Sequence, residues 1–534
     1  WRLAALFLIV VATLAGGLAG DRLLAVSGSA REGLHAYAAL VSAAKERYGG
    51  EVAYRDLVFA SIQGMLRKLD PHTNFLSPEA YASMREKQQV SFYGLGILVG
   101  LRAGRLTVIS PIEGTPASRL GIRAGDIIDL IEGEPTSKMS VDEAVSRLKG
   151  PKGTEVHITI LRAGLPEPLE LTVVRDEIPQ TTVRYAYMIA PGTGYVAISD
   201  FARSTESEVA QALDRLRAEG MERLIVDLRN NGGGLLDQAI EVADQFLPKG
   251  SSIVETRGRV RDSRQSFEAA GNHPAFGLPL VVLVNSGTAS AAEIVSGAIQ
   301  DHDMGLLVGT PTWGKGLVQT VYNIAYGAGL ALTTAKYYTP SGRLIQRDYH
   351  SYYDYYTRAD VDGEPGGERP RPRGPEFTTD LGRKVYGGGG ITPDIESEPA
   401  EVAPYLQFLV ARAAFFNFGV EYEAKHPEIA ADWKPDDALL DEFARWLVER
   451  DIDDEQEVAE GLADPAHREF ALRRIRAEVL GSKFGIQASH RVLAEEDAQI
   501  RTALESFPRA AELLATRLAR GDAPRVAAAT PEPH

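Results

Sequence analysis

A serine at the start of a predicted helix is the residue whose surroundings first suggest chemistry. Ser290 follows an apolar run that ends at Val284, and Glu293 lies three residues further on. This spacing is typical of a capping box, in which serine and glutamate side chains bond the free N–H groups of the first helical turn. The small neighbours Ala289 and Ala291 leave the hydroxyl accessible, and the positive end of the helix dipole lies close to it. Ser290 alone is therefore consistent with a helix cap or with a nucleophile.

A lysine between two glycines offers the base that a serine nucleophile needs. Lys315 lies among small and apolar residues in the string GTPTWGKGLVQT. A lysine that is buried in such surroundings has a lowered pKa, so its neutral amine could remove the proton of a hydroxyl. Ser–Lys pairs are one known way to activate a serine. A phosphate-binding lysine or one that reaches to solvent is the alternative, but the string lacks the Lys-Ser/Thr ending of a Walker loop.

Three consecutive glycines form the third segment with chemical potential. The string DLRNNGGGLL, residues 227–236, reads as a buried strand that runs into a glycine loop. Glycines leave backbone N–H groups accessible, and such groups suit an oxyanion hole. A simple turn before a helix explains the same residues, so this segment alone decides nothing.

Other chemistries fit the chain less well. On a helix that continues from Ser290, His302 would lie about 18 Å away, because each residue rises about 1.5 Å, so a Ser–His triad is not expected. The sequence holds no cysteine and no H-E-x-x-H string, which argues against a zinc protease and excludes a cysteine nucleophile. We expect no metal and no cofactor. The formal net charge of −16 argues against a nucleic-acid partner.

The elements that would position these residues alternate between strand and helix. Residues 179–400 therefore predict a layered α/β core. Residues 349–386, which are rich in Tyr, Arg, Gly and Pro, interrupt the pattern as a surface loop or small insertion. Residues 30–88 and 401–520 predict helices, and residues 521–534 a disordered tail. The predicted fold class is a multidomain α+β protein.

Residues 89–178 predict a compact β-rich module with glycine-containing turns and one main helix, SVDEAVSRLKG. The module resembles a PDZ domain of the bacterial protease-associated kind. The resemblance implies a loop whose N–H groups hold the carboxylate of a peptide C-terminus, beside a strand that pairs with the peptide. By match, this loop consists of Tyr93, Gly94, Leu95, Gly96 and Ile97.

The first 20 residues, WRLAALFLIVVATLAGGLAG, are almost entirely apolar. Their length is near the lower limit for a helix that spans a membrane and long for the apolar part of a signal peptide. We expect an uncleaved anchor or a cleaved signal, with a buried helix of the globular part as the alternative. Either of the first two readings predicts that the rest of the chain is exported.

Taken together, the motifs resemble the C-terminal processing peptidases, also called tail-specific proteases. The resemblance covers roughly residues 35–400, and the insertion at 349–386 is atypical. The strings that carry it are DLRNNGGGLL, SGTASAAEI and GKGLVQT after the PDZ-like module, with GMLRKLDPHTNFLSPEAY, GLALTTAKYYTPSGRLIQ and GGGGITPDI as further landmarks.

The resemblance implies a serine peptidase whose nucleophile is Ser290 and whose general base is Lys315. Gln319 matches the glutamine that orients the lysine, and Thr288 stands where many relatives carry serine. The oxyanion hole would use the backbone N–H groups of Ala291 and of one glycine in 232–234. Gly233 is our choice among the three.

The family also implies a setting for this activity. The PDZ module would receive substrates with free C-termini and could gate the site, at the periplasmic face of a bacterial inner membrane. The helical ends leave room for an adaptor or activating protein, or for a homo-oligomer. A peptide-binding scaffold on a degenerate protease fold is the main alternative, although a scaffold has no need for Ser290, Lys315 and Gln319. A crotonase-like acyl-CoA enzyme shares the glycine loop but predicts neither a PDZ module nor a base lysine.

Overall fold

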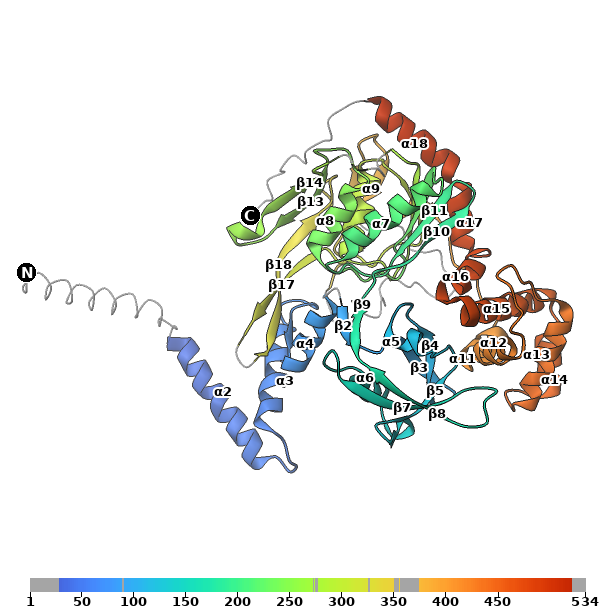
Figure 1. Cartoon of the computed structure of the whole chain (residues 1–534). Helices are drawn as coiled ribbons and strands as arrows, with labels where there is room; N and C mark the ends of the chain where they lie inside the picture. The colour runs from blue at the N-terminus through green and yellow to red at the C-terminus, as the bar shows by residue number, and fades with distance from the viewer. Residues whose placement is uncertain are drawn as a thin grey trace, which may run out of the picture. The chain divides into compact units, whose positions relative to one another are not determined.

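The computed structural model describes residues 28–88, 91–271, 273, 277–324, 327–349, 355 and 374–520 (Figure 1). The chain divides into a first unit, Trp1–Tyr81 with Gln319–Thr333, and a second unit, Ala82–Val318 with Thr334–His534. The predicted anchor or signal at 1–20, the tail at 521–534 and most of the insertion lie outside the described residues. Among the helices that are described, none has the length and apolar character needed to cross a membrane.

The first unit combines helices with a short antiparallel pairing. Its strand β1, Asn74–Leu76, pairs with the first half of β18, Gly329–Tyr338, which also pairs with β17, Leu317–Asn323. Its small core contains Leu66, Phe75 and Ala328. The helices of this region are α2 (Gly28–Arg47), α3 (Tyr54–Leu66) and α4 (Pro78–Lys87), the last of which begins here.

A six-stranded antiparallel sheet forms the β-rich module of the second unit, with strand order β3-β4-β5-β7-β8 and β6 beside β5. Strand β3 is an edge strand, so one side of its backbone is open for pairing. Strand β2 pairs with β9 at the junction to the next domain. The elements are β2 (Ser91–Gly94), β3 (Ile97–Arg102), β4 (Arg105–Pro111), α5 (Pro116–Arg119), β5 (Ile127–Ile131), β6 (Glu134–Pro135), η1 (Thr136–Lys138), α6 (Val141–Leu148), β7 (Glu155–Leu161), β8 (Leu169–Val174) and β9 (Asp176–Pro179).

The central sheet of the second unit has six strands in the order β10-β11-β12-β15-β16-β21. All neighbours from β11 onward are parallel, and only β10 is antiparallel to its neighbour. The strands are β10 (Val183–Ala190), β11 (Thr193–Ile198), β12 (Arg223–Asp227), β15 (Leu280–Val284), β16 (Leu306–Gly309) and β21 (Ile395–Glu396). The alternation of strand and helix in the sequence thus corresponds to a mostly parallel sheet, as crossover connections require.

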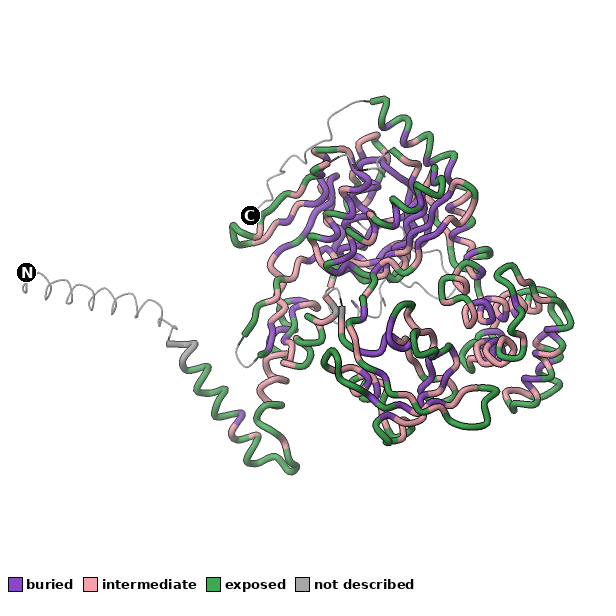
Figure 2. Tube along the Cα trace, in the orientation of Figure 1, coloured by how far each residue is buried: buried purple, intermediate pink, exposed green. Residues whose placement is uncertain are grey.

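Helices cover both faces of this sheet, which explains why its strands are apolar without interruption. On β12, Leu224 and Val226 pack with helices α7 (Thr205–Ala218), α8 (Leu236–Asp244) and α9 (Ala291–Asp301). Ile225, between them, packs with α17 (Ala498–Glu505) and α18 (Phe507–Arg520) on the opposite face. Figure 2 shows the central strands and α9 as largely buried, and every residue of α9 is buried.

A smaller antiparallel sheet consists of β13 (Ser252–Arg257), β14 (Gln265–Glu268) and the second half of β18. Buried residues of β13 and β18 belong to the same apolar core as the central sheet. Within the predicted insertion, β19 (Glu376–Thr378) and β20 (Lys384–Tyr386) form a hairpin. Arg383 in this hairpin forms ion pairs with Asp303 and Asp394, so the described end of the insertion is tied to the core.

The predicted C-terminal extension contains two structural parts. Helices from α11 to α16 gather around their own apolar core, which includes Phe415, Phe443 and Ile475. The last two helices, α17 and α18, pack instead on the central sheet through Ile500 and Phe507. The remaining helices are α11 (Pro404–Ala411), α12 (Ala414–Lys425), α13 (Asp437–Glu449), α14 (Glu455–Gly461), α15 (Pro465–Phe484) and α16 (Ile486–Ala494).

Candidate active site

Two neighbouring parallel strands bring the glycine loop and Ser290 to one edge of the sheet. Strands β12 and β15 pair in parallel, so the loops that follow their carboxyl ends emerge side by side. The Ala289 N–H donates to the carbonyl of Asn231 at 2.9 Å, and the Thr288 hydroxyl donates to the carbonyl of Leu228 at 2.8 Å. The segments that looked separate in the sequence are therefore fastened to each other.

Ser290 occupies a strained turn between β15 and α9. Its backbone has φ 58° and ψ −116°, a combination that costs a non-glycine residue of the order of 1–3 kcal/mol. The predicted capping box with Glu293 is present, and the Ser290 N–H donates to Glu293 Oε2 at 2.8 Å. Neither half of the box uses the proton of the Ser290 hydroxyl. Ser290 can thus cap the helix while its hydroxyl proton stays available for transfer to a base.

Gly233 lies directly against the serine. Its φ is +102°, and an added Cβ would lie 2.7 Å from the Ser290 Cβ and 3.0 Å from the Ala291 nitrogen. A side chain at this position would therefore collide with the turn that carries Ser290. Ala291 is the first residue of α9, so its N–H has no partner within the helix. The Gly233 N–H donates to Asn231 Oδ1 at 2.9 Å in this conformation.

The Glu293 carboxylate holds the loop that carries Lys315 against the turn that carries Ser290. Glu293 Oε2, which accepts from the Ser290 N–H, also accepts from the Lys315 N–H at 2.9 Å. Glu293 Oε1 accepts from the Gly314 N–H at 2.8 Å and from the Thr312 hydroxyl at 2.5 Å. One carboxylate thus holds the backbones of the two predicted catalytic residues. Lys315 as a whole residue is partly exposed.

A tyrosine hydroxyl makes a second bridge between the same two residues. The Tyr337 hydroxyl lies 2.5 Å from the carbonyl oxygen of Lys315 and 3.1 Å from the carbonyl oxygen of Ser290. Its backbone N–H donates to the carbonyl of Gly316 at 2.9 Å. Tyr337 is only 1% exposed. Burial, together with the nearby Glu293 and Tyr355, raises the pKa of Tyr337 well above its usual value, so the hydroxyl stays protonated and donates.

Complete burial also raises the pKa of Glu293 above its ordinary value of 4.5. The four hydrogen bonds from Thr312, Lys315, Ser290 and Gly314 act in the opposite direction, because they favour the ionised carboxylate. The protonation state of Glu293 therefore depends on whether these four hydrogen bonds are formed.

A charged cluster behind the glycine loop connects it to the C-terminal helices. Asp227, the last residue of β12, accepts from the Tyr195 hydroxyl at 2.6 Å and pairs with Arg229 at 2.7 Å. Arg229 also pairs at 2.8 Å with Asp497, the N-cap of α17. The C-terminal region therefore contributes directly to the support of the loop, and no motif in the sequence indicated this.

The remaining predicted residues lie elsewhere in the fold. Gln319 belongs to the first unit, where its Nε2 donates to the carbonyl of His72 at 2.5 Å, and its role toward Lys315 stays a prediction. His302 ends α9, with its ring nitrogens 2.8 Å from Asp380 Oδ2 and 2.7 Å from the carbonyl of Ser252. Both ring nitrogens of His302 therefore have partners outside the Ser290 turn.

The predicted PDZ loop spans a strand end and a turn. Tyr93 and Gly94 end β2 and pair with Glu177 and Asp176 of β9, so these two residues are part of a ladder. The turn itself consists of Leu95 and Gly96, and Ile97 begins the edge strand β3. The Thr115 hydroxyl lies 3.1 Å from the carbonyl of Gly96, whose φ is +79°. The predicted carboxylate-binding role of these residues stays a prediction.

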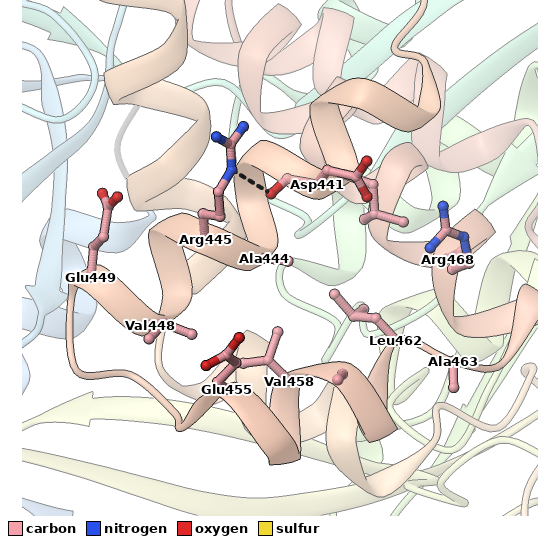
Figure 3. A pocket seen from close by; sticks show the side chains of 12 residues that line it. Asp441, Ala444, Arg445, Val448, Glu449, Glu455, Val458, Leu462, Ala463 and Arg468 are labelled. Carbon is pink, nitrogen blue, oxygen red and sulfur yellow. Dashed lines mark hydrogen bonds between the residues drawn. The ribbon is translucent and has the colours of Figure 1, made fainter.

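A cavity of about 560 Å³ lies in the helical part of the C-terminal region, between α13 and α14 (Figure 3). Its walls combine apolar residues, such as Val448 and Leu462, with charged ones, such as Asp441 and Glu455. None of the predicted site residues lines it. The candidate active site is therefore the edge of the sheet at Ser290, not this cavity.

Known families match three parts of the chain. Residues 192–351 match peptidase family S41, residues 107–162 match the PDZ domain, and residues 405–469 match the "probable PDZ-protease, C-terminal helical domain". The first match contains the glycine loop, Ser290 and Lys315, and the third coincides with much of the separate helical core.

Individual relatives agree with these matches. The chain is 41% identical to the carboxy-terminal-processing protease of Bartonella bacilliformis, over 54% of this chain and 67% of the relative. It is also 41% identical to the carboxyl-terminal-processing protease of a Synechocystis species, over 55% of this chain and 69% of the relative. A solved structure, the photosystem II D1 C-terminal processing protease, is 28% identical, with 66% of this chain and 85% of that chain covered at a TM-score of 0.36.

A serine-type peptidase core and a PDZ domain are thus combined in one polypeptide. The chain belongs to the carboxyl-terminal processing protease family.

Proposed function

We propose that this chain is an endopeptidase that cleaves protein substrates with a Ser290–Lys315 dyad through an acyl-enzyme. The observation that carries the proposal is the double bridge between these two residues. Glu293 binds both of their N–H groups, and Tyr337 lies within hydrogen-bond distance of both of their carbonyl groups. A pair held this closely from two sides fits a catalytic unit better than a helix cap beside an unrelated loop.

In the proposed reaction, the neutral Lys315 amine takes the proton of the Ser290 hydroxyl as the oxygen attacks the carbonyl carbon of the substrate. The ammonium then gives the proton to the leaving amine, and a water molecule that is deprotonated in the same way releases the acyl group. The attachment of the Lys315 backbone to the Ser290 turn through Glu293 supports this role, because it holds the base loop beside the serine. No cofactor is needed for these steps.

The oxyanion of the tetrahedral intermediate would accept hydrogen bonds from the Ala291 and Gly233 N–H groups. The contact of Gly233 with the serine turn supports this choice among the three glycines. Because the Gly233 N–H now donates to Asn231, it would have to exchange this acceptor for the substrate oxygen. We therefore expect a small rearrangement of the glycine loop when substrate binds.

The PDZ domain would select substrates by their free C-termini. The open edge of β3 supports this proposal, because an extended peptide could pair with it as an additional strand. Leu98 is 49% exposed on this strand. A chain captured in this way would be presented to Ser290, and the PDZ domain could thereby gate cleavage. Deletion of residues 89–178 should then change both the rate and the choice of substrate.

The direct test uses the full chain with Ser290→Ala and Lys315→Ala as single variants. Each protein is incubated with an unfolded substrate that ends in apolar residues, and the products are identified by mass spectrometry. We expect cleavage by the wild type and none by either variant, while circular dichroism shows that all three are folded. Cleavage by Ser290→Ala at the wild-type rate would reduce Ser290 to a helix cap.

The alternative function, a non-catalytic PDZ scaffold, predicts a different result in the same experiment. A scaffold binds the substrate but leaves it intact, so binding should be seen in the wild type and both variants without any product. Binding is measured in parallel by fluorescence anisotropy of a labelled C-terminal peptide. Binding without cleavage, also after addition of a candidate activating protein, would favour the scaffold.

A further inference from the structure

We propose that Tyr337 is a positioning residue, whose hydroxyl holds the Lys315 loop and the Ser290 turn in reactive register. The inference rests on the proposed function. Tyr337 lies on β18, whereas Ser290 begins α9 and Lys315 precedes β17. Three separate elements therefore meet at one hydroxyl group.

The Tyr337 hydroxyl connects the Ser290 turn to the Lys315 loop, which the hydrogen bonds within helix α9 do not do. The Ser290 carbonyl already accepts from the N–H groups of Glu293 and Ile294, at 2.8 and 3.1 Å, as the first turn of a helix requires. These bonds lie within one element and do not reach the lysine loop. The single proton of the Tyr337 hydroxyl is shared between the two elements in a three-centre hydrogen bond. Its shorter branch goes to the Lys315 carbonyl at 2.5 Å, and its longer branch goes to the Ser290 carbonyl at 3.1 Å.

The contact with Ser290 also bears on the oxyanion hole. The Ser290 carbonyl and the Ala291 N–H belong to one planar trans peptide unit, so they point in opposite directions. A donor that holds the carbonyl from the side of β18 therefore keeps the Ala291 N–H directed toward the other side. Tyr337 would act on the nucleophile turn and the base loop at once, without touching the substrate.

The backbone of Tyr337 adds rigidity to the arrangement. Its N–H donates to the Gly316 carbonyl at 2.9 Å, so β18 holds the residue next to the lysine independently of the side chain. Loss of the hydroxyl alone would leave the strand in place but would free the Lys315 carbonyl. We therefore expect a local loss of alignment and not a loss of the fold.

Tyr337→Phe tests this inference, because it removes one oxygen atom and keeps the ring. We expect kcat to fall by about 10- to 100-fold, the range that a small misplacement of catalytic groups causes. KM should stay within about twofold, since Tyr337 does not contact substrate. Amide hydrogen exchange should become faster in residues 312–316 and 288–292.

Tyr187→Phe is the matched control. Tyr187 is also buried, at 2% exposure, and its hydroxyl is bonded to His490 Nδ1 at 2.9 Å, in the core on the other face of the sheet. It should lose comparable thermal stability but keep its kcat. Replacement of Tyr337 by p-aminophenylalanine, which retains a donor at the same place, should restore most of the rate, whereas p-fluorophenylalanine should not. If Tyr337→Phe does not fold, the comparison of the p-aminophenylalanine and p-fluorophenylalanine variants still tests the role of the hydroxyl.

An unchanged kcat for Tyr337→Phe would overturn the inference, and so would equal losses of kcat in the Tyr187 and Tyr337 variants. Ser290→Ala is run in the same assay to separate this failure from a failure of the proposed function. If Ser290→Ala cleaves as well as the wild type, the dyad itself is wrong. If Ser290→Ala is silent and Tyr337→Phe matches the wild type, only the role of Tyr337 is wrong.

Discussion

At the scale of single residues, the hydrogen bonds that Glu293 accepts compensate the cost of burying its carboxylate. Four groups donate to this carboxylate: the N–H groups of Ser290, Gly314 and Lys315, and the Thr312 hydroxyl. A carboxylate suits such a site because both of its oxygens accept and neither donates. An amide of the same shape offers one acceptor and one donor.

Glu293→Gln should therefore lower kcat strongly. Its amide NH₂ would replace one of the two accepting oxygens, so either the Ser290 and Lys315 N–H groups or the Gly314 N–H would lose their acceptor. We expect a loss of about 100-fold in kcat, with a loss of about 1–3 kcal/mol in the free energy of unfolding. Steady-state kinetics and urea denaturation measure the two effects.

Glu421→Gln is a suitable control for this experiment. Glu421 also accepts from a side-chain donor, the indole N–H of Trp446 at 3.0 Å, but it lies on α12, which packs in the separate helical part. Its substitution should leave kcat near the wild-type value. Equal kinetics for wild type and Glu293→Gln would contradict the bridge as a requirement for activity.

The raised pKa of Glu293 predicts how its contribution to stability varies with pH. A carboxyl whose pKa is higher in the folded than in the unfolded state takes up a proton on folding, in the window from its ordinary value of 4.5 upward. Its favourable contribution is complete below that window and is lost as pH rises through the folded-state pKa. The stability of the wild type relative to Glu293→Gln should thus be greatest below pH 4.5 and smaller at pH 8.

Urea denaturation of both proteins at several pH values measures this difference, because the other carboxyl groups cancel in the comparison. A difference that grows with pH would show that Glu293 has a lowered pKa instead. In that case the four hydrogen bonds would outweigh burial.

How far the sequence could predict this site depends on the residue. Ser290 and Lys315 stood in recognisable strings, and Glu293 was visible as the partner in a capping box. Its second role, toward Lys315, was not predictable, because the spacing in a helix says nothing about which distant loop packs against the helix start. Tyr337 gave no signal, since a tyrosine in an apolar strand usually only fills a core.

At the scale of elements, the glycine loop and the serine turn are shaped by each other. Gly233 has φ +102° and lies where any Cβ would be 2.7 Å from the Ser290 Cβ. Gly232 has open space around it, with no heavy atom within 4 Å of an added Cβ. Two neighbouring glycines thus have different requirements, although the sequence presents them identically.

Gly233→Ala should abolish most activity, whereas Gly232→Ala should be tolerated. In the first variant, alanine would have to adopt the positive φ of Gly233, at a cost of the order of 1–3 kcal/mol. Its Cβ would also collide with Ser290 and displace the turn. We expect its kcat to fall by about 100-fold or more. The second change should alter kcat by about twofold at most. Peptide cleavage rates for both variants, with thermal unfolding as a check of the fold, decide the matter.

The reverse order of activities would contradict the choice of Gly233 and would favour Gly232 as the glycine beside the nucleophile. The sequence predicted that a strand would lead into this loop, because apolar periodicity and glycines are local signals. It could not predict which glycine would touch the serine. That choice depends on the register between β12 and β15, which is set by the whole sheet.

At the scale of the whole molecule, the C-terminal region shows the limit of local patterns most clearly. Residues 401–520 were predicted as one helical extension, and the described residues there are indeed mostly helical. Helical periodicity shows which face is apolar but not what covers it. The first helices enclose their own core, whereas α17 and α18 cover one face of the catalytic sheet and supply Asp497 to the glycine-loop cluster.

Phe507→Ala tests whether α17 and α18 are structurally part of the catalytic domain. Phe507 is 2% exposed in the core between α18 and the central sheet, and Arg223 stacks on its ring at 4.9 Å. Loss of a buried phenylalanine side chain should lower the free energy of unfolding by about 3–5 kcal/mol. Leu518→Ala, on the same helix but 47% exposed, should change it by about 0.5 kcal/mol or less.

Amide hydrogen exchange shows where this loss of stability falls. If the last helices complete the sheet, Phe507→Ala should speed exchange in β12 and β15 and should lower peptidase activity as the glycine loop loosens. The separate core around Phe443 should keep its protection, because it does not share the apolar contacts of α18. Faster exchange confined to α18 would instead mean that this helix is an appended element on which the catalytic sheet does not depend.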